Sequence, residues 1–282
     1  MISESALYES IETNGVFIGG GQYGKIYVHT VEDGDPTGLP PGSYAFKIQR
    51  QGYYQYVKAE IQFRSEYRLL YADTLLKLVG FGLDDACRRA CLVMEYISGG
   101  QLKHKLHDLE LQSIVKVLHD IAYGLHLVHS HFPDPIIHGD LKPENVLLKG
   151  DKALLCDFGT VTSVGERRRR SDPVYDGQCW GFVNCTKTEV YFIGVLLFEM
   201  ITNVSVKYDE NDSLIERVNR LIPDSSACED QVQKRLLQPG YDRQLLAQLI
   251  ELGKKCIYKE ETKRLAAFQV ADVLHSLMTE NE

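Results

Sequence analysis

The sequence predicts an α+β fold in two parts, with strands concentrated in the first part of the chain and helices in the rest. Residues 15–30 alternate apolar and polar side chains around a run of glycines, which predicts two strands joined by a turn. Apolar residues recur at helical spacing from 114 to 128, and residues 189–202 are apolar almost all round. Separation of strands from helices along a chain is typical of α+β architecture.

Local signals predict the remaining elements. Residues 31–43 are rich in Pro, Gly and Asp and are expected to form a loop. In order, we expect a strand at 44–49, a helix at 57–71, strands at 77–83 and 90–96, a glycine break at 98–100, and late helices at 242–257 and 266–278. The break divides the chain into a β-rich part, 1–95, and a helical part, 96–282, which together form one domain.

Composition narrows the class of protein. With 282 residues and 44% hydrophobic content, the chain can form a sizeable core. Its net charge of -8 argues against nucleic-acid partners and anionic membranes, and no apolar run is long enough for membrane insertion. The seven cysteines contain no CxxC pair and are interpreted as reduced thiols. We expect a cytoplasmic protein, with delivery into a host cell as an open alternative; the sequence leaves the oligomeric state undetermined.

The most informative motif is HGDLKPEN at 138–145, followed by Asp157-Phe158-Gly159. It places Asp140 and Asn145 five residues apart, with Asp157 seventeen residues after Asp140. Phosphoryl transfer requires a carboxylate near the proton of the nucleophile, and oxygen ligands that hold Mg²⁺ on the phosphates. The whole string therefore indicates a phosphotransferase.

A glycine-rich segment, Gly19 to Gly24, fits the pattern G-x-G-x-x-G. Glycines let backbone N–H groups approach phosphates closely, although the pattern alone is equally typical of a hairpin. A dinucleotide-binding fingerprint would need a helix directly after the glycines. Residues 25–28 instead continue as a strand, which excludes that fingerprint.

Together with Tyr44-Ala45-Phe46-Lys47 and the hinge-like segment 94–97, these motifs resemble the protein kinase superfamily over nearly the whole chain. The resemblance implies a two-lobed fold with a small β-rich N-lobe and a larger α-helical C-lobe. It also implies ATP and Mg²⁺ as cofactors and a protein as substrate. The form DLKPEN resembles serine/threonine kinases, so we expect Ser or Thr as the phosphate acceptor.

The resemblance also implies roles for single residues. Asp140 would act as base or orient the nucleophile, and Lys142 would neutralise the γ-phosphate. Asn145 and Asp157 would hold Mg²⁺, because hard oxygen ligands suit that cation. The implied ATP contacts are Ile18, Gly19, Gly21, Gly24, Ile26, Ala45, Lys47, Glu66, Met94, Glu95, Ile97 and Leu147.

The helical partner of Lys47 has two candidates. Glu66 lies nineteen residues after the lysine, and Glu60 is its competitor. We expect Glu66, because Leu70 one turn later supplies the apolar neighbour that the resemblance implies.

The chain departs from the kinase pattern at three places. Gly139 stands where many kinases have Arg, so we expect activity that does not depend on a phosphorylated activation loop. The segment 160–188 contains no Ala-Pro-Glu, which leaves the partner of Arg264 open. Glu189 replaces the usual aspartate and could still accept N–H bonds near His138.

A basic run, Arg167–Arg170, precedes Ser171. It could dock an acidic substrate, direct phosphorylation of Ser171, or simply be a solvated loop. Two other functions also stay open. The altered activation segment would fit a pseudokinase that acts as an ATP-binding scaffold. His-Gly-Asp also occurs in small-molecule phosphotransferases, although Lys142-Pro143-Glu144 argues against that class.

Overall fold

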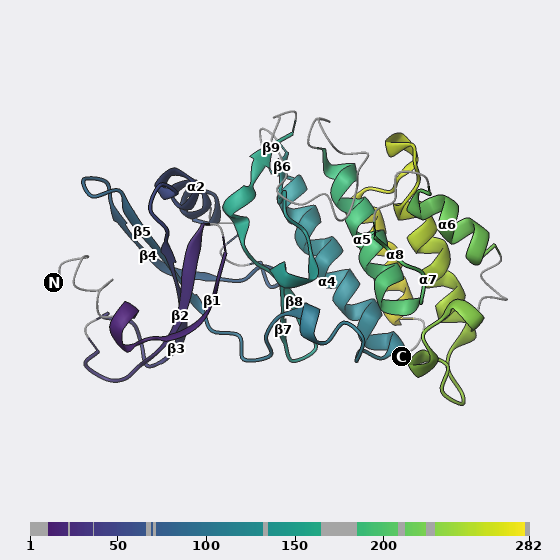
Figure 1. Ribbon diagram of the computed structural model, residues 1–282, viewed down its shortest axis with the longest axis horizontal. Helices are drawn as coiled ribbons and strands as arrows, with labels where there is room; N and C mark the ends of the chain where they lie inside the picture. The colour runs from purple at the N-terminus through teal and green to yellow at the C-terminus, as the bar shows by residue number, and fades with distance from the viewer. Residues whose placement is uncertain are drawn as a thin grey trace. The chain divides into compact units, whose positions relative to one another are not determined.

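The computed structural model describes residues 11–21, 23–35, 37–65, 69, 72–131, 135–164, 185–207, 212–223 and 229–279. The chain forms two compact units (Figure 1). The first comprises Met1–Ser98 with Asp157–Thr160, and the second comprises Gly99–Cys156 with Val161–Glu282. A β-sheet dominates the first unit and helices dominate the second, so the predicted α+β, two-lobed fold class is confirmed.

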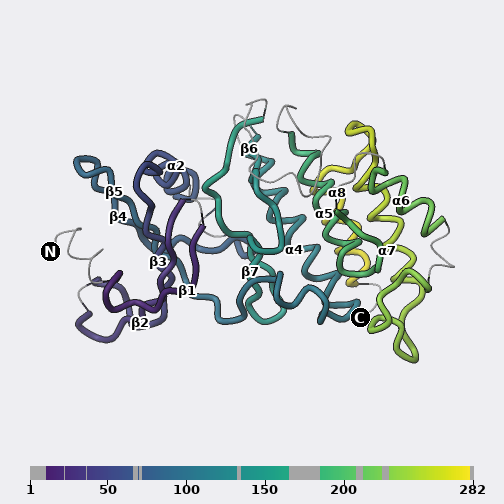
Figure 2. The backbone as a smooth tube through the Cα atoms, in the orientation of Figure 1, coloured from purple at the N-terminus to yellow at the C-terminus, as the bar shows by residue number. Residues whose placement is uncertain are grey.

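The first unit is built on a five-stranded antiparallel sheet with the order β1-β2-β3-β5-β4. Its strands are β1 (Val16–Gly20), β2 (Gly24–Val31), β3 (Gly42–Gln49), β4 (Leu78–Asp84) and β5 (Arg89–Glu95). One helix, α2 (Tyr54–Arg64), follows β3 and packs against β5. Figure 2 traces these segments in purple to blue.

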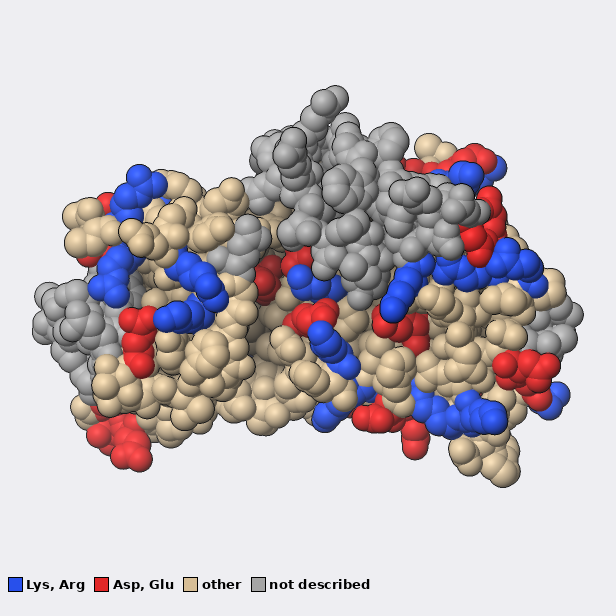
Figure 3. Space-filling view, viewed as in Figure 1, with Lys and Arg blue, Asp and Glu red and all other residues tan. Residues whose placement is uncertain are grey.

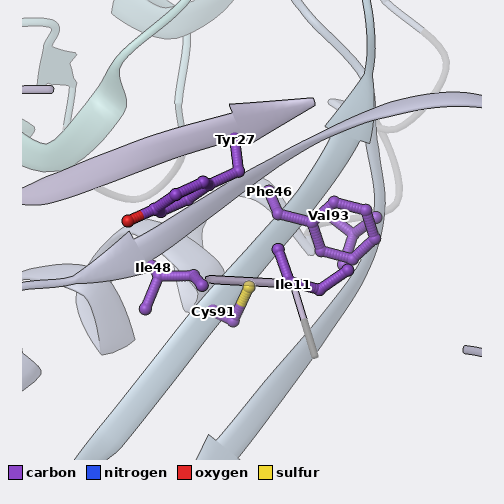
Figure 4. Close-up of a cluster of buried hydrophobic side chains, with 6 residues drawn as sticks. All are labelled: Ile11, Tyr27, Phe46, Ile48, Cys91 and Val93. Atoms are coloured by element: carbon purple, nitrogen blue, oxygen red, sulfur yellow. The ribbon is translucent and has the colours of Figure 1, made fainter. Parts of the chain in front are cut away.

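The strand register separates the two faces of this sheet. Phe46 and Ile48 on β3 lie opposite Tyr27, Val93 and Cys91 on the neighbouring strands, so all five side chains share one face. They form a buried hydrophobic cluster that Ile11 also joins (Figure 4). Because side chains alternate along a strand, the next residue, Lys47, must point to the opposite face.

The second unit is mainly helical. Its helices are α4 (Leu111–His129), α5 (Thr186–Ile201), α6 (Leu214–Leu221), α7 (Arg243–Cys256) and α8 (Ala267–Thr279). Short strands pair as β6 (Ile136–Ile137) with β9 (Thr162–Ser163) and β7 (Val146–Lys149) with β8 (Lys152–Leu155). The 3₁₀ helices among the described residues are η1 (Leu102–His104), η2 (Pro143–Asn145), η3 (Phe158–Thr160), η5 (Glu229–Gln231), η6 (Lys234–Leu236) and η7 (Glu261–Lys263).

Helix α5 is the central helix of the second unit, as its apolar sequence predicts. It packs against α4 and α7, and most of its side chains are buried. Gly194 allows the close approach to α7, because a Cβ there would lie 2.8 Å from Cys256 Cβ and 2.6 Å from Ile257 Cγ2. The same helix carries Glu189 in its first turn.

Some element boundaries differ from expectation. Helix α2 begins at Tyr54 and ends at Arg64, whereas the sequence pattern predicted residues 57–71. The pairs β6–β9 and β7–β8 and the helix α6 were not predicted, because segments this short carry too little alternation or periodicity to register.

Within the described residues, no helix combines the length and apolar character needed to cross a lipid bilayer. Charged side chains of both signs are interspersed over the face shown in Figure 3. The five described cysteines, Cys87, Cys91, Cys156, Cys185 and Cys256, are free thiols.

Backbone strain in the turn between β4 and β5 gives a first prediction. Arg88 has φ 51°, a left-handed conformation that suits glycine better than arginine. Arg88→Gly should therefore raise the free energy of unfolding, by up to about 1 kcal/mol, in chemical denaturation. Arg89→Gly is the matched control: Arg89 starts β5, so its replacement should lower that free energy. Destabilisation by both variants would contradict the assignment of strain to Arg88.

Candidate active site

The first group of candidate residues surrounds a buried lysine. Lys47 Nζ lies 2.8 Å from Glu60 Oε2 and 2.6 Å from Asp157 Oδ1, all within the first compact unit. Burial by itself would lower the pKa of Lys47, but the two carboxylates outweigh it and raise the pKa above its ordinary value. The side chain is therefore a fixed ammonium ion.

Helix α2 supplies the carboxylate because one of its faces is buried against the sheet. Glu60 is 1% exposed and shares that face with Val57, Ile61 and Arg64. Its second oxygen, Oε1, accepts a hydrogen bond of 3.2 Å from the backbone N–H of Phe158. Both carboxylate oxygens of Glu60 are thus engaged.

The partner of Lys47 corrects the expected pairing. The sequence predicts Glu66 as this partner, whereas the structure places Glu60 on the lysine. Helix α2 ends at Arg64, and Glu66 and Leu70 lie outside the described residues. Arg64, one helical turn after Glu60, is the neighbour that the sequence argument missed: it contacts Glu60 Oε1 at 3.5 Å and Met94 Sδ at 3.3 Å.

Asp157 reaches Lys47 through an unusual backbone conformation. Its φ is 61°, in the left-handed region that non-glycine residues seldom adopt. The following Phe158 is buried, packs on Phe63 with 5.5 Å between ring centroids, and lies beneath the Arg64 guanidinium. These contacts fix the turn, and strain of this kind is concentrated at functional sites.

The glycine-rich turn approaches the lysine closely. A Cβ on Gly24 would lie 2.7 Å from Ile48 O and 3.2 Å from Lys47 Cγ, so only glycine fits. The backbone N–H of Gly21 donates to Gly24 O at 3.0 Å and closes the turn. Ile18, in the middle of the preceding strand β1, is half exposed.

The sheet places several predicted ATP contacts on one face. Ile26 lies opposite Lys47, and Ala45 lies opposite Met94, so these four side chains point to the same side. Gly19 belongs to β1 and Glu95 ends β5, while Ile97 is buried just after it. Leu147 belongs to the second compact unit, where β7 pairs it with Leu154.

A second group of candidate residues lies in the second unit. Asp140 Oδ2 is 2.7 Å from Lys142 Nζ and accepts a hydrogen bond of 2.9 Å from Asn145 Nδ2. The same amide donates to Asp140 O at 2.8 Å. Both contacts with side chains use Oδ2, so Oδ1 of Asp140 makes no hydrogen bond in the described part of the chain.

The ring of His138 connects this loop to the residue that follows strand β8. Its Nε2 is 3.0 Å from the carbonyl oxygen of Cys156, and its Nδ1 accepts from the backbone N–H of Asp140 at 3.3 Å. A carbonyl oxygen can only accept, so the Nε2 N–H of His138 is the donor in the bond to Cys156. The ring therefore ties Asp140 to the end of strand β8.

The carboxylate of Glu189 contacts the backbone of the same loop. Its carboxylate accepts from the backbone N–H groups of His138 at 3.0 Å and Gly139 at 2.8 Å, as the sequence analysis anticipated. His129, which that analysis missed, lies 2.8 Å from the same carboxylate. Burial would raise the pKa of Glu189, but the bond and charge of His129, with His138 and the Gly139 N–H, hold it below its ordinary value. The apolar spacing of residues 114–128 predicted this helix but gave no sign that His129, the residue after it, would contact Glu189.

The side chain of Arg264 has hydrogen-bond acceptors in the structure, although the chain contains no Ala-Pro-Glu motif to supply a glutamate partner. Its Nε donates to Tyr258 O at 2.7 Å, and its guanidinium lies 4.8 Å from the ring centroid of Tyr191. Lys187 Nζ in turn donates to Arg264 O at 2.7 Å. The basic run Arg167–Arg170 and Ser171 lie outside the described residues.

Comparison with known proteins agrees with this geometry. The model of the protein kinase domain family matches residues 13–275. The chain therefore belongs to the protein kinase family.

Three curated relatives from Arabidopsis thaliana illustrate the similarity. Probable serine/threonine-protein kinase PBL5 is 30% identical, and PBL6 is 29% identical; each match covers 93% of this chain and 64% of the relative. A probable LRR receptor-like serine/threonine-protein kinase is 28% identical over 85% of this chain and 22% of its own length. The chain thus spans less than two thirds of each of these proteins.

The Glu189 contacts predict a pH-dependent stability. Glu189→Gln removes the charge and turns an amide NH₂ toward N–H donors, so the free energy of unfolding at pH 7 should fall by about 2 to 4 kcal/mol. Because the pKa is below its ordinary value of 4.5, this contribution is complete above pH 4.5 and disappears as the pH falls further. Denaturation of both proteins from pH 3 to 8 checks it.

The exposed Glu251 provides the control for this experiment, since Glu251→Gln changes the same group on the surface. It should leave stability nearly unchanged at every pH. A Glu189→Gln variant as stable as the parent protein at pH 7 would contradict the role of the carboxylate.

Proposed function

We propose that the chain is a serine/threonine protein kinase that transfers the γ-phosphate of MgATP to a hydroxyl group of a protein. The observation that carries the proposal is the ammonium of Lys47, fixed between Glu60 and Asp157 beneath the glycine-rich turn. A buried cation in a glycine-lined site suits a polyphosphate. The names of the relatives support Ser and Thr as acceptors.

Asp140 and Lys142 would serve the acceptor. The Ser or Thr hydroxyl gives its proton to the Asp140 carboxylate while its oxygen bonds to the γ-phosphorus, and the bond from that phosphorus to the bridging oxygen breaks to release ADP. Oδ1 of Asp140 is the oxygen for that proton, since Oδ2 already contacts Lys142 and Asn145. The ammonium of Lys142 would offset the negative charge beside the Asp140 carboxylate.

Asn145 and Asp157 fit the proposed role as Mg²⁺ ligands. The amide nitrogen of Asn145 is committed to Asp140, which leaves the amide oxygen for a cation. Asp157 contributes a carboxylate, and Mg²⁺ prefers such oxygens. The metal would neutralise charge on the phosphates. The described residues hold no cluster of three or more His, Cys, Asp and Glu ligands, but Mg²⁺ needs only one or two protein carboxylates beside the phosphates.

Removal of the proposed base tests the reaction. With labelled ATP, Mg²⁺ and a casein-like acceptor, the parent protein should place label on Ser or Thr. Asp140→Asn should lower the rate by about 10²- to 10⁴-fold, because the proton loses its acceptor. Asp151→Asn is the matched control: this aspartate is 76% exposed in the turn between β7 and β8, and its variant should keep the parent rate.

The pattern of outcomes separates the proposal from its alternatives. Label equal in the parent and the Asp140→Asn protein would contradict catalysis by this loop. A thermal shift with MgATP, abolished by Asp157→Ala but without transfer, would indicate a pseudokinase. Label on a small molecule but not on protein would indicate a small-molecule phosphotransferase.

We further propose that activity does not depend on a phosphorylated activation loop. Gly139 has φ 84° and donates its N–H to Glu189, so the position that holds Arg in many kinases is here a glycine in a left-handed turn. An arginine would adopt that conformation only with strain. The usual cationic partner of a loop phosphate is therefore missing at this position.

Phosphatase treatment tests this independence. Protein freed of phosphate, as verified by intact mass, should keep at least half of its initial rate. A kinase that is known to require its loop phosphate serves as the control and should lose activity under the same treatment. Complete loss of the rate in this protein, restored by rephosphorylation, would contradict the proposal.

A further inference from the structure

Three tyrosine rings gather beside the glycine-rich turn. The ring of Tyr23 lies 5.5 Å from that of Tyr53, nearly perpendicular to it, and 5.4 Å from that of Tyr56. Tyr53 and Tyr56 are 5.8 Å apart, so every pair is in contact. These separations lie in the range that aromatic pairs prefer. We call the three residues the tyrosine cluster.

The cluster connects the turn to helix α2. Tyr23 belongs to the glycine-rich turn, and its carbonyl oxygen accepts a hydrogen bond of 2.9 Å from the N–H of Arg50, just after β3. Tyr56 lies in the first turn of α2, four residues before Glu60. Residues four apart lie on the same side of a helix, so the rings attach the turn to the helix that delivers Glu60.

The cluster also reaches the ion cluster of the candidate site. A Cβ on Gly159 would lie 3.5 Å from Tyr23 Cδ2, 3.5 Å from Glu60 Oε2 and 3.4 Å from Asp157 Oδ1. The ring of Tyr23 thus lies within van der Waals range of the space above Gly159, which also borders the two carboxylates that contact Lys47. The same ring contacts Tyr56 on helix α2 and lies close to Gly159.

We propose that the tyrosine cluster is a latch that holds the glycine-rich turn in place to receive the nucleotide phosphates. Tyr23 and Tyr56 are positioning residues: they act through the backbone N–H groups of the turn. This inference rests on the proposed function, because it assigns a cause to the position of the phosphate-binding turn.

The cluster is separate from the hydrophobic core of the first unit. That core lies on the other face of the sheet, around Phe46, and its residues are almost fully buried. Tyr56 is 41% exposed, and Tyr23 and Tyr53 are half-buried. Truncation of these rings should therefore loosen the turn while leaving the fold intact.

Nucleotide affinity tests the latch. Calorimetric titration with the magnesium complex of a non-hydrolysable ATP analogue should show binding weakened about 3- to 10-fold by Tyr23→Ala and by Tyr56→Ala. The double variant should lose less than the product of the two factors, because the rings contact each other. Tyr23→Phe keeps the ring and should bind like the parent. In steady-state assays KM for ATP should rise while kcat changes by less than about twofold.

A control and an independent measurement accompany the titration. Tyr123, 43% exposed on α4 in the second unit, gives the matched control Tyr123→Ala, which should bind like the parent. Amide exchange at Gly21, followed by NMR without nucleotide, should accelerate in Tyr23→Ala and Tyr56→Ala. That N–H closes the turn, so its exchange reports the latch directly.

The outcomes distinguish failure of the latch from failure of the proposed function. Unchanged affinity with unchanged Gly21 exchange in both variants would overturn the latch, and so would fully multiplicative losses in the double variant. A parent protein that binds no nucleotide would contradict the proposed function, and the exchange rates alone would then decide whether the latch exists.

Discussion

The placement of Lys47 between Glu60 and Asp157 is the interaction on which the first unit depends. A buried ammonium ion is tolerated only when nearby carboxylates offset the lost hydration, and removal of one partner leaves an uncompensated charge. Strand β3 supplies the lysine, helix α2 the glutamate, and a short segment from the second half of the sequence the aspartate. This ion cluster therefore joins strand β3, helix α2 and Asp157 within the first unit. The same requirement explains the left-handed conformation of Asp157, since the carboxylate must reach the lysine while Phe158 is buried against Phe63.

A second buried charge organises the second unit by the same physics. The Glu189 carboxylate is fully buried, and it is satisfied by two backbone N–H groups and by His129. These hydrogen bonds orient the backbone of the loop that carries His138 and Gly139, and the ring of His138 accepts a further one from the N–H of Asp140. Glutamate is one methylene longer than the aspartate usual at this position, and it still meets both N–H groups. The geometry of the loop thus depends on satisfying the carboxylate more than on its exact length.

Two of the departures from the family pattern, at Gly139 and at the partner of Arg264, can be explained by contacts in the structure. Gly139 adopts a conformation that glycine tolerates best, and its N–H serves Glu189. Arg264, buried without the glutamate of Ala-Pro-Glu, bonds a carbonyl oxygen and stacks on Tyr191. The Gly139 N–H and the Arg264 guanidinium thus both have acceptors within the described part of the chain.

The sequence by itself determined the α+β class, the main helices and strands, and the string from His138 to Gly159, because periodicity and motif spacing are local properties of a chain. It also anticipated that Glu189 would accept N–H bonds near His138. Only the tertiary structure decided which glutamate meets Lys47: Glu60 and Glu66 are both helical candidates by spacing, and the choice depends on which helix face packs against the sheet and where α2 ends. The sequence likewise could not predict three other contacts: that of His129 with Glu189, that of Tyr191 with Arg264, and those within the tyrosine cluster. Each joins residues far apart in the chain or across a turn, and such contacts are set by packing, of which a linear pattern carries no record.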